Sequence, residues 1–235
     1  MRGDLLSYLR GHARLGNLLL TVTMAGRVIA IDGPAASGKS TVARSVASAV
    51  GFLFVSSGHF YRALAWGTVV EGIPDEKLNA WMTERPITVE EKGNAISLLL
   101  DGKDATPHLS DPEVTAKVSQ IATFPCMRDF VNSRLHALAE ERDLVMEGRD
   151  IGSVVFPSTP WKFYLDASPE ERARRRARQG DEDPIAERDR LDSTRVTAPL
   201  VIPEGSIVID TTHLSLEQVV DAVIARLGNI EPLNP

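Results

Sequence analysis

Short apolar runs recur along the chain and are typical of parallel strands that are buried on both faces. Segments with the apolar spacing of amphipathic helices lie between them. The runs are 28–31, 52–55, 144–146, 161–165 and 207–209, and the helical segments are about 40–50, 59–70, 111–121 and 126–142, with two more after the capping boxes at Ser168 and Ser215. Strands that alternate with helices predict an α/β fold, here a five-stranded parallel sheet covered by helices on both faces.

Residues 86–101 break this alternation. Two β-prone runs, 87–89 and 96–100, flank the segment 91–94, whose sequence Glu-Lys-Gly-Asn is a hairpin signal. We therefore expect a small insert over about 84–125, inside one domain that spans residues 24–235.

Residues 1–23 show no periodicity that would build a core. They carry three arginines and one short apolar run, Leu18–Leu20. A secretory signal would need a longer apolar run and a cleavage site of small residues. We expect a disordered leader, or a start assigned too early, because Met24 stands just ahead of the first strand.

Composition narrows the class of protein. The chain has 235 residues, 43% of them hydrophobic and 25% charged, and its formal net charge of -6 argues against general binding to nucleic-acid polymers. Cys126 is the only cysteine, which excludes an intrachain disulfide and fits a reducing cytosol. No apolar run reaches the roughly 20 residues of a membrane-spanning helix. We expect a cytoplasmic monomer without a membrane partner.

The strand at 28–31 leads into a match to the phosphate-loop pattern G-x-x-x-x-G-K-[ST]. Its glycines let the backbone wrap around phosphate, and the N-terminus of the following helix adds a favourable dipole. Lys39 can reach the β- and γ-phosphates of ATP, and the Ser40 hydroxyl can bind Mg²⁺. The predicted ATP-binding residues are Gly33, Pro34, Ala35, Ala36, Ser37, Gly38, Lys39, Ser40 and Thr41.

Three classes of protein share this loop. The Asn-Lys-x-Asp motif of GTPase switches and the Leu-Ser-Gly-Gly-Gln motif of transporter ATPases do not occur in the chain. A small-molecule kinase needs a second anion site at the carboxyl ends of the strands, where open parallel sheets bind ligands. Candidates for that site follow the second and third strands: Ser57, Arg62, Arg149 and Asp150.

A kinase of this kind also needs a mobile lid that carries arginines. Residues 170–195 hold eight arginines, and most of these are expected to form a solvated helix face. Arg188 and Arg195 are the exceptions, because they lie beyond a break at 180–184 where a lid could close.

Four motifs together resemble those of bacterial cytidylate kinases. They are Gly-Pro-x-x-Ser-Gly-Lys at 33–39, Ser-Gly-x-x-Tyr-Arg at 57–62, Glu-Gly-Arg-Asp-Ile-Gly-Ser-Val-Val-Phe-Pro at 147–157 and Arg-Asp-x-x-Asp-x-x-Arg-x-x-x-Pro-Leu at 188–200. The resemblance runs from about 28 to 227. It implies a nucleoside monophosphate kinase that uses ATP and Mg²⁺ to convert CMP or dCMP to the diphosphate, with the insert as a CMP-binding domain and a lid at about 179–196.

The resemblance also implies roles for single residues. The residues matching phosphate-binding positions for CMP are Ser57, Arg62 and Arg149, and those matching cytosine-reading positions are Ser119, Arg128 and Asp150. Arg188, Asp192 and Arg195 match lid positions that reach the transferring phosphoryl group and the ribose. The catalytic set is then Lys39, Arg149, Arg188 and Arg195.

The chain departs from the family pattern in three places. Ser56 stands where the family often has Asp, Glu147 replaces an Asp, and the segment 179–188 is shorter than in many relatives. His59 lies in the segment 56–62, where the acceptor site is expected to begin, and is interpreted as a wall residue of the site. A kinase for another small acceptor, such as UMP, a different nucleotide or shikimate, and a non-enzymatic nucleotide switch remain as alternatives.

Overall fold

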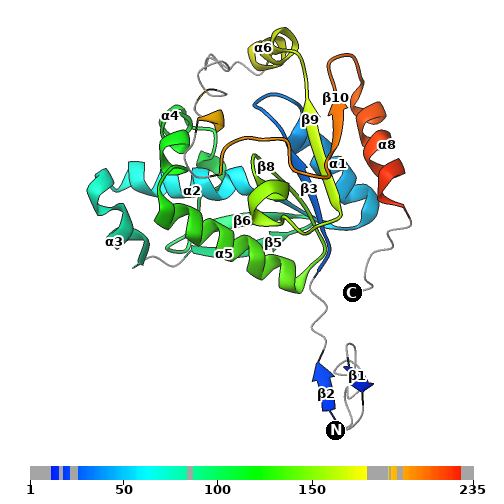
Figure 1. Cartoon of the computed structure of the whole chain (residues 1–235). Coiled ribbons are helices and arrows are strands. Elements are labelled where there is room, and N and C mark those ends of the chain that lie inside the picture. The colour runs from blue at the N-terminus through cyan, green and yellow to red at the C-terminus, as the bar shows by residue number, and fades with distance from the viewer. Residues whose placement is uncertain are drawn as a thin grey trace.

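The predicted parallel sheet forms the centre of the computed structural model (Figure 1). The structure describes residues 12–15, 18–21, 26–83, 87–178, 190, 192–194 and 198–228. Parallel strands lie side by side in the order β10 (Ile207–Asp210), β9 (Trp161–Asp166), β3 (Val28–Asp32), β8 (Leu144–Gly148) and β4 (Leu53–Ser56). The α/β prediction is confirmed, and each predicted run forms one of these strands.

The sequence of β3 explains its central position. All its residues are buried, and it pairs with β8 on one side and β9 on the other. Successive side chains point to opposite faces: Ile29 and Ile31 join one hydrophobic cluster, whereas Val28 and Ala30 join the other. The strand ends at Asp32, at the same edge where β4 and β8 end.

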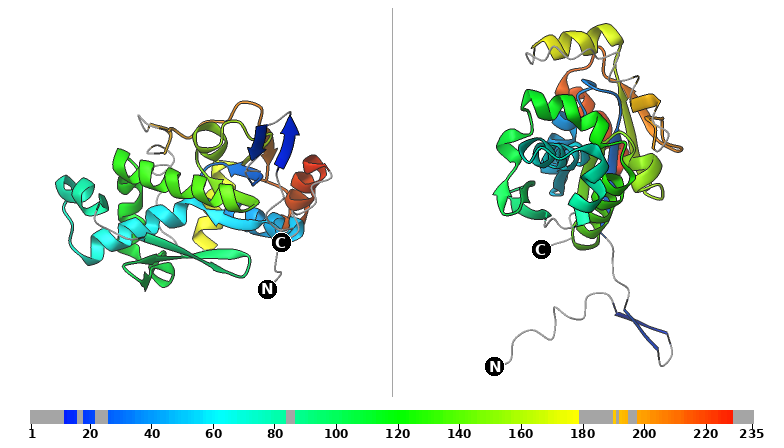
Figure 2. Two further views of the ribbon diagram at one scale, coloured as in Figure 1. Left: turned by 90° about the horizontal axis from the view of Figure 1, so that it is seen from below. Right: turned by 90° about the vertical axis from the view of Figure 1, so that its left-hand side faces the viewer.

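Helices cover both faces of the sheet (Figures 1 and 2). The cluster around Ile29 contains side chains of α1 (Lys39–Val50) and α8 (Leu216–Leu227), and the cluster around Ala30 contains those of α2 (Ser57–Val70) and α5 (Pro125–Glu141). Ser215 caps α8 in the predicted reciprocal capping box with Gln218. Ser168, the residue before α6 (Pro169–Arg178), accepts a hydrogen bond at its Oγ from the Glu171 N–H at 3.2 Å.

The insert region contains the expected hairpin, formed by β5 (Ile87–Lys92) and β6 (Ala95–Leu100). The short strand β7 (Lys103–Asp104) pairs with β6, and α3 (Leu78–Thr83) and α4 (Pro112–Ile121) lie before and after these strands. The sheet continues into the hairpin because Phe54 of β4 pairs with Ala95 of β6. Side chains of β6 and α4 also share a hydrophobic cluster with α2. The insert is therefore packed onto the main core.

Two short strands, β1 (His12–Leu15) and β2 (Leu18–Thr21), lie within the leader region, where we expected no regular element. They pair with each other in an antiparallel sheet that is separate from the main one. Within the described part of the chain, no helix is both long enough and apolar enough to span a membrane.

Candidate active site

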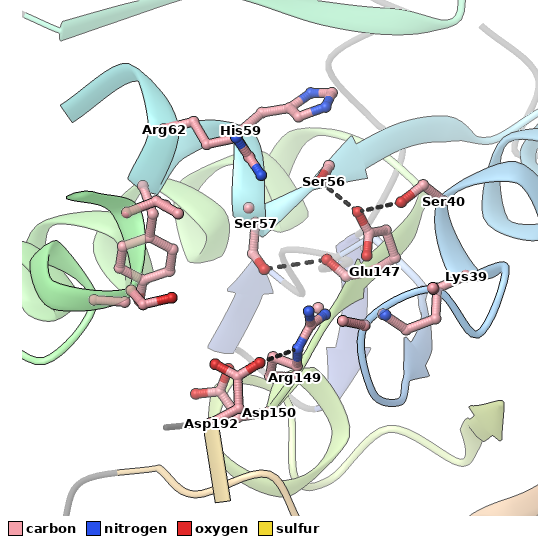
Figure 3. Close-up of a pocket in the computed structure, with 18 of the residues that line it drawn as sticks. Lys39, Ser40, Ser56, Ser57, His59, Arg62, Glu147, Arg149, Asp150 and Asp192 are labelled. Atoms are coloured by element: carbon pink, nitrogen blue, oxygen red, sulfur yellow. Dashed lines mark hydrogen bonds and ion pairs between the residues drawn. The ribbon is translucent and has the colours of Figure 1, made fainter. Parts of the chain in front are cut away.

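A cavity of about 270 Å³ opens at the carboxyl ends of β3, β4 and β8 (Figure 3). Its walls come from the phosphate loop, the start of α2, the segment after β8, and α4. Most of the residues that the sequence singled out line it: Ala35, Ala36, Gly38, Lys39, Ser40, Thr41, Ser57, Arg62, Ser119, Arg149, Asp150 and Asp192. The structure therefore brings the predicted donor site and the predicted acceptor site together in one space.

The phosphate loop between β3 and α1 needs glycine at defined points. Gly33 has a φ of 149°, and a Cβ there would lie 2.1 Å from the carbonyl oxygen of Leu165. Gly38 has a φ of 92° and caps the N-terminus of α1. Ala36 also has a positive φ, of 60°, which costs energy for a non-glycine residue unless its surroundings impose it. Something must therefore hold this loop in shape.

Three side chains hold the loop by donating hydrogen bonds to its carbonyl oxygens. Arg172 Nη1 donates to the oxygen of Ala35 at 3.3 Å, and Thr211 Oγ1 donates to the oxygen of Ser37 at 3.1 Å. Lys39 Nζ folds back onto the loop and donates to the oxygen of Pro34 at 2.7 Å. These hydrogen bonds direct the carbonyl oxygens of the loop toward the three donors and fix its shape.

The expectation that the arginines of α6 are mostly solvated is wrong for one face of that helix. Arg172 is buried, and Arg175 donates to the Thr211 oxygen at 2.7 Å. Arg176 lines the cavity. These residues lie three and four positions apart, so they share one helix face. Arg174 and Arg178 are exposed, as expected.

Glu147, near the end of β8, connects the start of α1 to the end of β4 (Figure 3). Its Oε1 accepts hydrogen bonds from Ser40 Oγ at 3.0 Å and from Ser56 Oγ at 2.5 Å. Burial alone would raise the pKa of this carboxyl group, but the charge of Lys39 and the Ser56 hydrogen bond outweigh it, so the pKa is lowered. Glu147 is thus an anion beside Ser40. The two oxygen atoms fit the hard-oxygen ligands that Mg²⁺ prefers.

The acceptor half of the cavity begins with α2. Ser57 Oγ donates to the backbone oxygen of Glu147 at 3.1 Å, which places this hydroxyl between β4 and β8. Arg62 Nη1 donates to the Leu109 oxygen at 2.7 Å and to Thr115 Oγ1 at 2.9 Å. Arg62 therefore connects α2 to the insert at the rim of the cavity.

Two ion pairs stand at the other side of the acceptor half. Arg149 Nε lies 2.7 Å from Asp192 Oδ2, so a residue of the predicted lid contacts the segment after β8. Arg128 of α5 forms a buried ion pair with Asp150, and its guanidinium lies 5.9 Å from the centre of the Tyr61 ring. Both pairs join residues that sequence analysis had assigned to acceptor binding.

His59 lines the cavity, in keeping with the wall role expected of it. Burial lowers the pKa of its imidazole, and the charges of Arg44 and Arg62 lower it further against the opposing effect of Glu147. The ring packs edge-on against Phe54, with 6.5 Å between the ring centres. A neutral imidazole is therefore favoured at this position.

Sequence analysis missed Asp32, the last residue of β3. Its side chain is fully buried, and its carboxylate accepts hydrogen bonds from the N–H groups of Ile151 and Gly152. Burial raises its pKa to about 6, against the lowering effect of these two hydrogen bonds. A charged residue that directly follows a buried apolar run was the available signal. Arg172 and Thr211 gave no comparable signal, because their roles depend on the fold.

Arg188 and Arg195 lie outside the residues that the structure describes. The same holds for most of the predicted lid at 179–196, of which only residues 190 and 192–194 are described. The roles of these two arginines stay predictions.

Comparisons with known proteins give a consistent family. A model of the cytidylate kinase family matches residues 29–229. A cytidylate kinase of Caldanaerobacter subterraneus subsp. tengcongensis is 43% identical over 211 residues, which cover 83% of this chain and 92% of that protein. One from Oleidesulfovibrio alaskensis is 37% identical over 85% of this chain and 97% of its own.

Among solved structures, a shikimate kinase from Acinetobacter baumannii is similar with a TM-score of 0.45 and 17% identity, over 86% of this chain and 93% of that one. The sequence relatives carry the assignment, because the match extends over nearly their whole length. The phosphate loop and all the residues described around the cavity fall inside the matched range. The chain therefore belongs to the cytidylate kinase family.

Proposed function

We propose that this protein transfers the γ-phosphate of ATP to CMP and dCMP, giving ADP and CDP or dCDP. The observation that carries the proposal is that one cavity is lined both by the phosphate loop and by Asp150, whose carboxylate pairs with the buried guanidinium of Arg128. Family membership supports the same reaction.

The phosphate loop would hold ATP. Its N–H groups at the start of α1 and the Lys39 ammonium group favour negative charge at this end of the cavity. Lys39 now donates to the Pro34 oxygen, and the β- and γ-phosphates would take the place of that oxygen. Because the transition state of phosphoryl transfer spreads negative charge over the γ-phosphoryl oxygens, Lys39 would stabilise it more strongly than the ground state.

Ser40 and Glu147 would hold Mg²⁺, Ser40 as a direct ligand and Glu147 through its carboxylate or a bound water. The ion supplies neutralisation of the charge that develops on the transferred phosphoryl group. The hydrogen bond from Ser40 to Glu147 keeps both oxygens at one side of the phosphate loop. The change from Asp to Glu at this position is therefore compatible with the family's chemistry.

The acceptor phosphate would bind between Ser57, Arg62 and Arg149. These residues come from α2 and from the segment after β8, so they approach the cavity from two sides (Figure 3). Arginine suits this role because its planar guanidinium offers several donors to phosphate oxygens. An ionised phosphate needs positioning rather than a general base.

Cytosine would be read by Asp150 and Arg128, together with Ser119, which lines the cavity from α4. Cytosine offers an N4 amino donor next to an N3 acceptor, and uracil reverses both. Asp150 can accept a hydrogen bond from the cytosine amino group, and Arg128 can donate to N3 or O2. In uracil, Asp150 would instead face the O4 acceptor and Arg128 would face the N3–H donor. Asp192 would contact the ribose, and it already lies against Arg149.

The lid would complete the site. Arg188 and Arg195 would reach the transferring phosphoryl group and the ribose when the lid closes, and closure would exclude water and so limit hydrolysis of ATP. We also expect the protein to be cytoplasmic and monomeric, with no binding to nucleic-acid polymers.

A coupled assay of ADP release with ATP and a panel of acceptors tests the proposal. We expect rapid turnover with CMP and dCMP and slow turnover with UMP or shikimate. Fast turnover with another acceptor would overturn the substrate assignment. Slow ATP hydrolysis that is independent of every acceptor would indicate a nucleotide switch instead.

A further inference from the structure

Arg149 and Asp150, two of the residues proposed to bind the acceptor, lie just beyond the last paired residues of β8. The pairing of β8 with β3 stops at Gly148, which is level with Asp32, and the pairing with β4 stops at Glu147. Arg149 and Asp150 follow directly. Their backbone therefore needs another connection to the sheet if the two side chains are to keep a fixed place.

Asp32 supplies that connection. Its Oδ1 accepts from the Ile151 N–H at 2.8 Å, and its Oδ2 accepts from the Gly152 N–H at 2.7 Å. Ile151 opens the π-helical turn Ile151–Val155, immediately after Asp150. Two hydrogen bonds to adjacent amides fix both the position and the orientation of this turn.

The chemistry of the contact requires a carboxylate. Two neighbouring N–H groups need two acceptor oxygens, and an amide side chain supplies only one, with a donor in place of the other. Glycine at position 152 completes the fit, because a Cβ there would lie 3.2 Å from Asp32 Oδ2. Burial of a charged group costs free energy, and the Asp32 side chain is fully buried. Its two hydrogen bonds to the turn offset part of this cost.

We propose that Asp32 is a positioning residue for the acceptor nucleotide. Its carboxylate holds the turn that follows Arg149 and Asp150 against the end of β3, directly before the phosphate loop. Gly33 of that loop follows Asp32 directly. One side chain thus sets the separation between the donor loop and the acceptor-binding residues. The inference rests on the proposed function in taking Arg149 and Asp150 as residues that bind the acceptor.

The substitution Asp32→Asn distinguishes a positioning role from a purely electrostatic one, because the two roles predict opposite changes in the affinity for CMP. Removal of a buried negative charge close to the acceptor-binding residues would by itself strengthen the binding of the anion CMP. A turn that has lost one of its two acceptors would instead weaken it, by about tenfold for one lost contact of ordinary strength. Isothermal titration of the full chain with CMP alone, and separately with a non-hydrolysable ATP analogue, measures both affinities.

We expect Asp32→Asn to raise the dissociation constant of CMP and to leave that of the ATP analogue unchanged or lower. Gly152→Ala presses on the same carboxylate and should act in the same direction. Thr159→Val is the matched control. Thr159 Oγ1 donates to the oxygen of Val28 at 2.5 Å, at the opposite end of β3. Loss of this hydrogen bond weakens the attachment of the same strand but does not affect the turn 151–155. We expect CMP binding by this variant to match that of the wild type.

Unchanged or tighter CMP binding by both Asp32→Asn and Gly152→Ala would overturn the proposal, even if melting temperatures fall. If Asp32→Asn does not fold, Gly152→Ala decides alone. If the wild type binds a different acceptor from CMP, the proposed function fails, and the same comparison with that acceptor still decides the role of Asp32. Failure of the wild type to bind any acceptor would overturn both.

Discussion

Ser40 at the start of α1 donates a hydrogen bond to Glu147 at the end of β8, with 3.0 Å between the two oxygen atoms. The contact joins residues that are 107 positions apart and places a buried anion beside the hydroxyl expected to bind Mg²⁺. Ser56 Oγ donates to the same carboxylate oxygen, so the side chain of Glu147 is held from both β4 and α1.

Glu147→Gln should weaken the use of Mg²⁺. The amide keeps an oxygen toward Ser40 but loses the negative charge, so the Mg²⁺ concentration for half-maximal activity should rise by roughly tenfold, the worth of one charged contact. Titration of Mg²⁺ at saturating ATP and CMP measures it. Glu140→Gln, on the exposed side of α5, is the control. If Glu147→Gln needs the same Mg²⁺ concentration as the wild type, the Glu147 carboxylate is not part of the metal site.

Lys39→Ala should abolish most of the turnover without unfolding the protein. Removal of its charge removes stabilisation of the transition state, and loss of one such donor lowers kcat by about 10² to 10³ or more. Steady-state kinetics with CMP, together with a circular dichroism spectrum, measure both outcomes. Lys77→Ala, at an exposed 3₁₀ turn, should keep the wild-type kcat, and near-normal kcat in folded Lys39→Ala would contradict the role given to Lys39.

The Asp32 carboxyl group should make stability depend on pH in a known direction. Its pKa is about 6 in the folded protein, whereas an unfolded chain has a pKa near 3.9, or about two units lower. Between these values the folded state binds the proton more strongly, so this group lowers the free energy of unfolding as pH rises from about 4 to 6. Two units correspond to about 3 kcal/mol.

Urea unfolding of wild type and Asp32→Asn at several values of pH tests this, because the variant cannot titrate at position 32. The stability of the wild type relative to the variant should fall as pH rises through this window and then level off above it. Parallel stability curves for the two proteins would show that the pKa of Asp32 is not raised.

Removal of residues 1–23 should leave the enzyme intact. Strands β1 and β2 pair with each other and belong to a sheet separate from the main one, so the core loses no pairing when they are removed. A chain that starts at Met24 should keep the melting temperature and the kcat of the full chain, as measured by calorimetry and the coupled assay. A melting temperature lower by several degrees would show that the leader packs on the domain.

Contiguous motifs explain how much of this protein could be predicted from its sequence. The phosphate loop, the Arg149–Asp150 pair and the strand runs each occupy neighbouring positions, so local pattern was sufficient. Asp32 was missed because its partners Ile151 and Gly152 lie 119 and 120 positions away. The pairing of Phe54 with Ala95 depends on how the insert packs, which no local pattern encodes. Arg172 looked solvated because a helix sequence does not reveal which loop lies against one of its faces.

The central claim is that the Arg128–Asp150 pair reads cytosine, and the ratio of kcat/KM for CMP to kcat/KM for UMP tests it most directly. Asp150→Ala removes the acceptor for the cytosine amino group, a charged hydrogen bond worth about 1.5–3 kcal/mol, or roughly tenfold to a hundred-and-fiftyfold in kcat/KM. Efficiency with CMP should therefore fall far more than efficiency with UMP, and the ratio should narrow by a factor in that range. Equal losses for both nucleotides, with the wild-type ratio preserved, would show that Asp150 only supports the structure around Arg128 and would contradict the account.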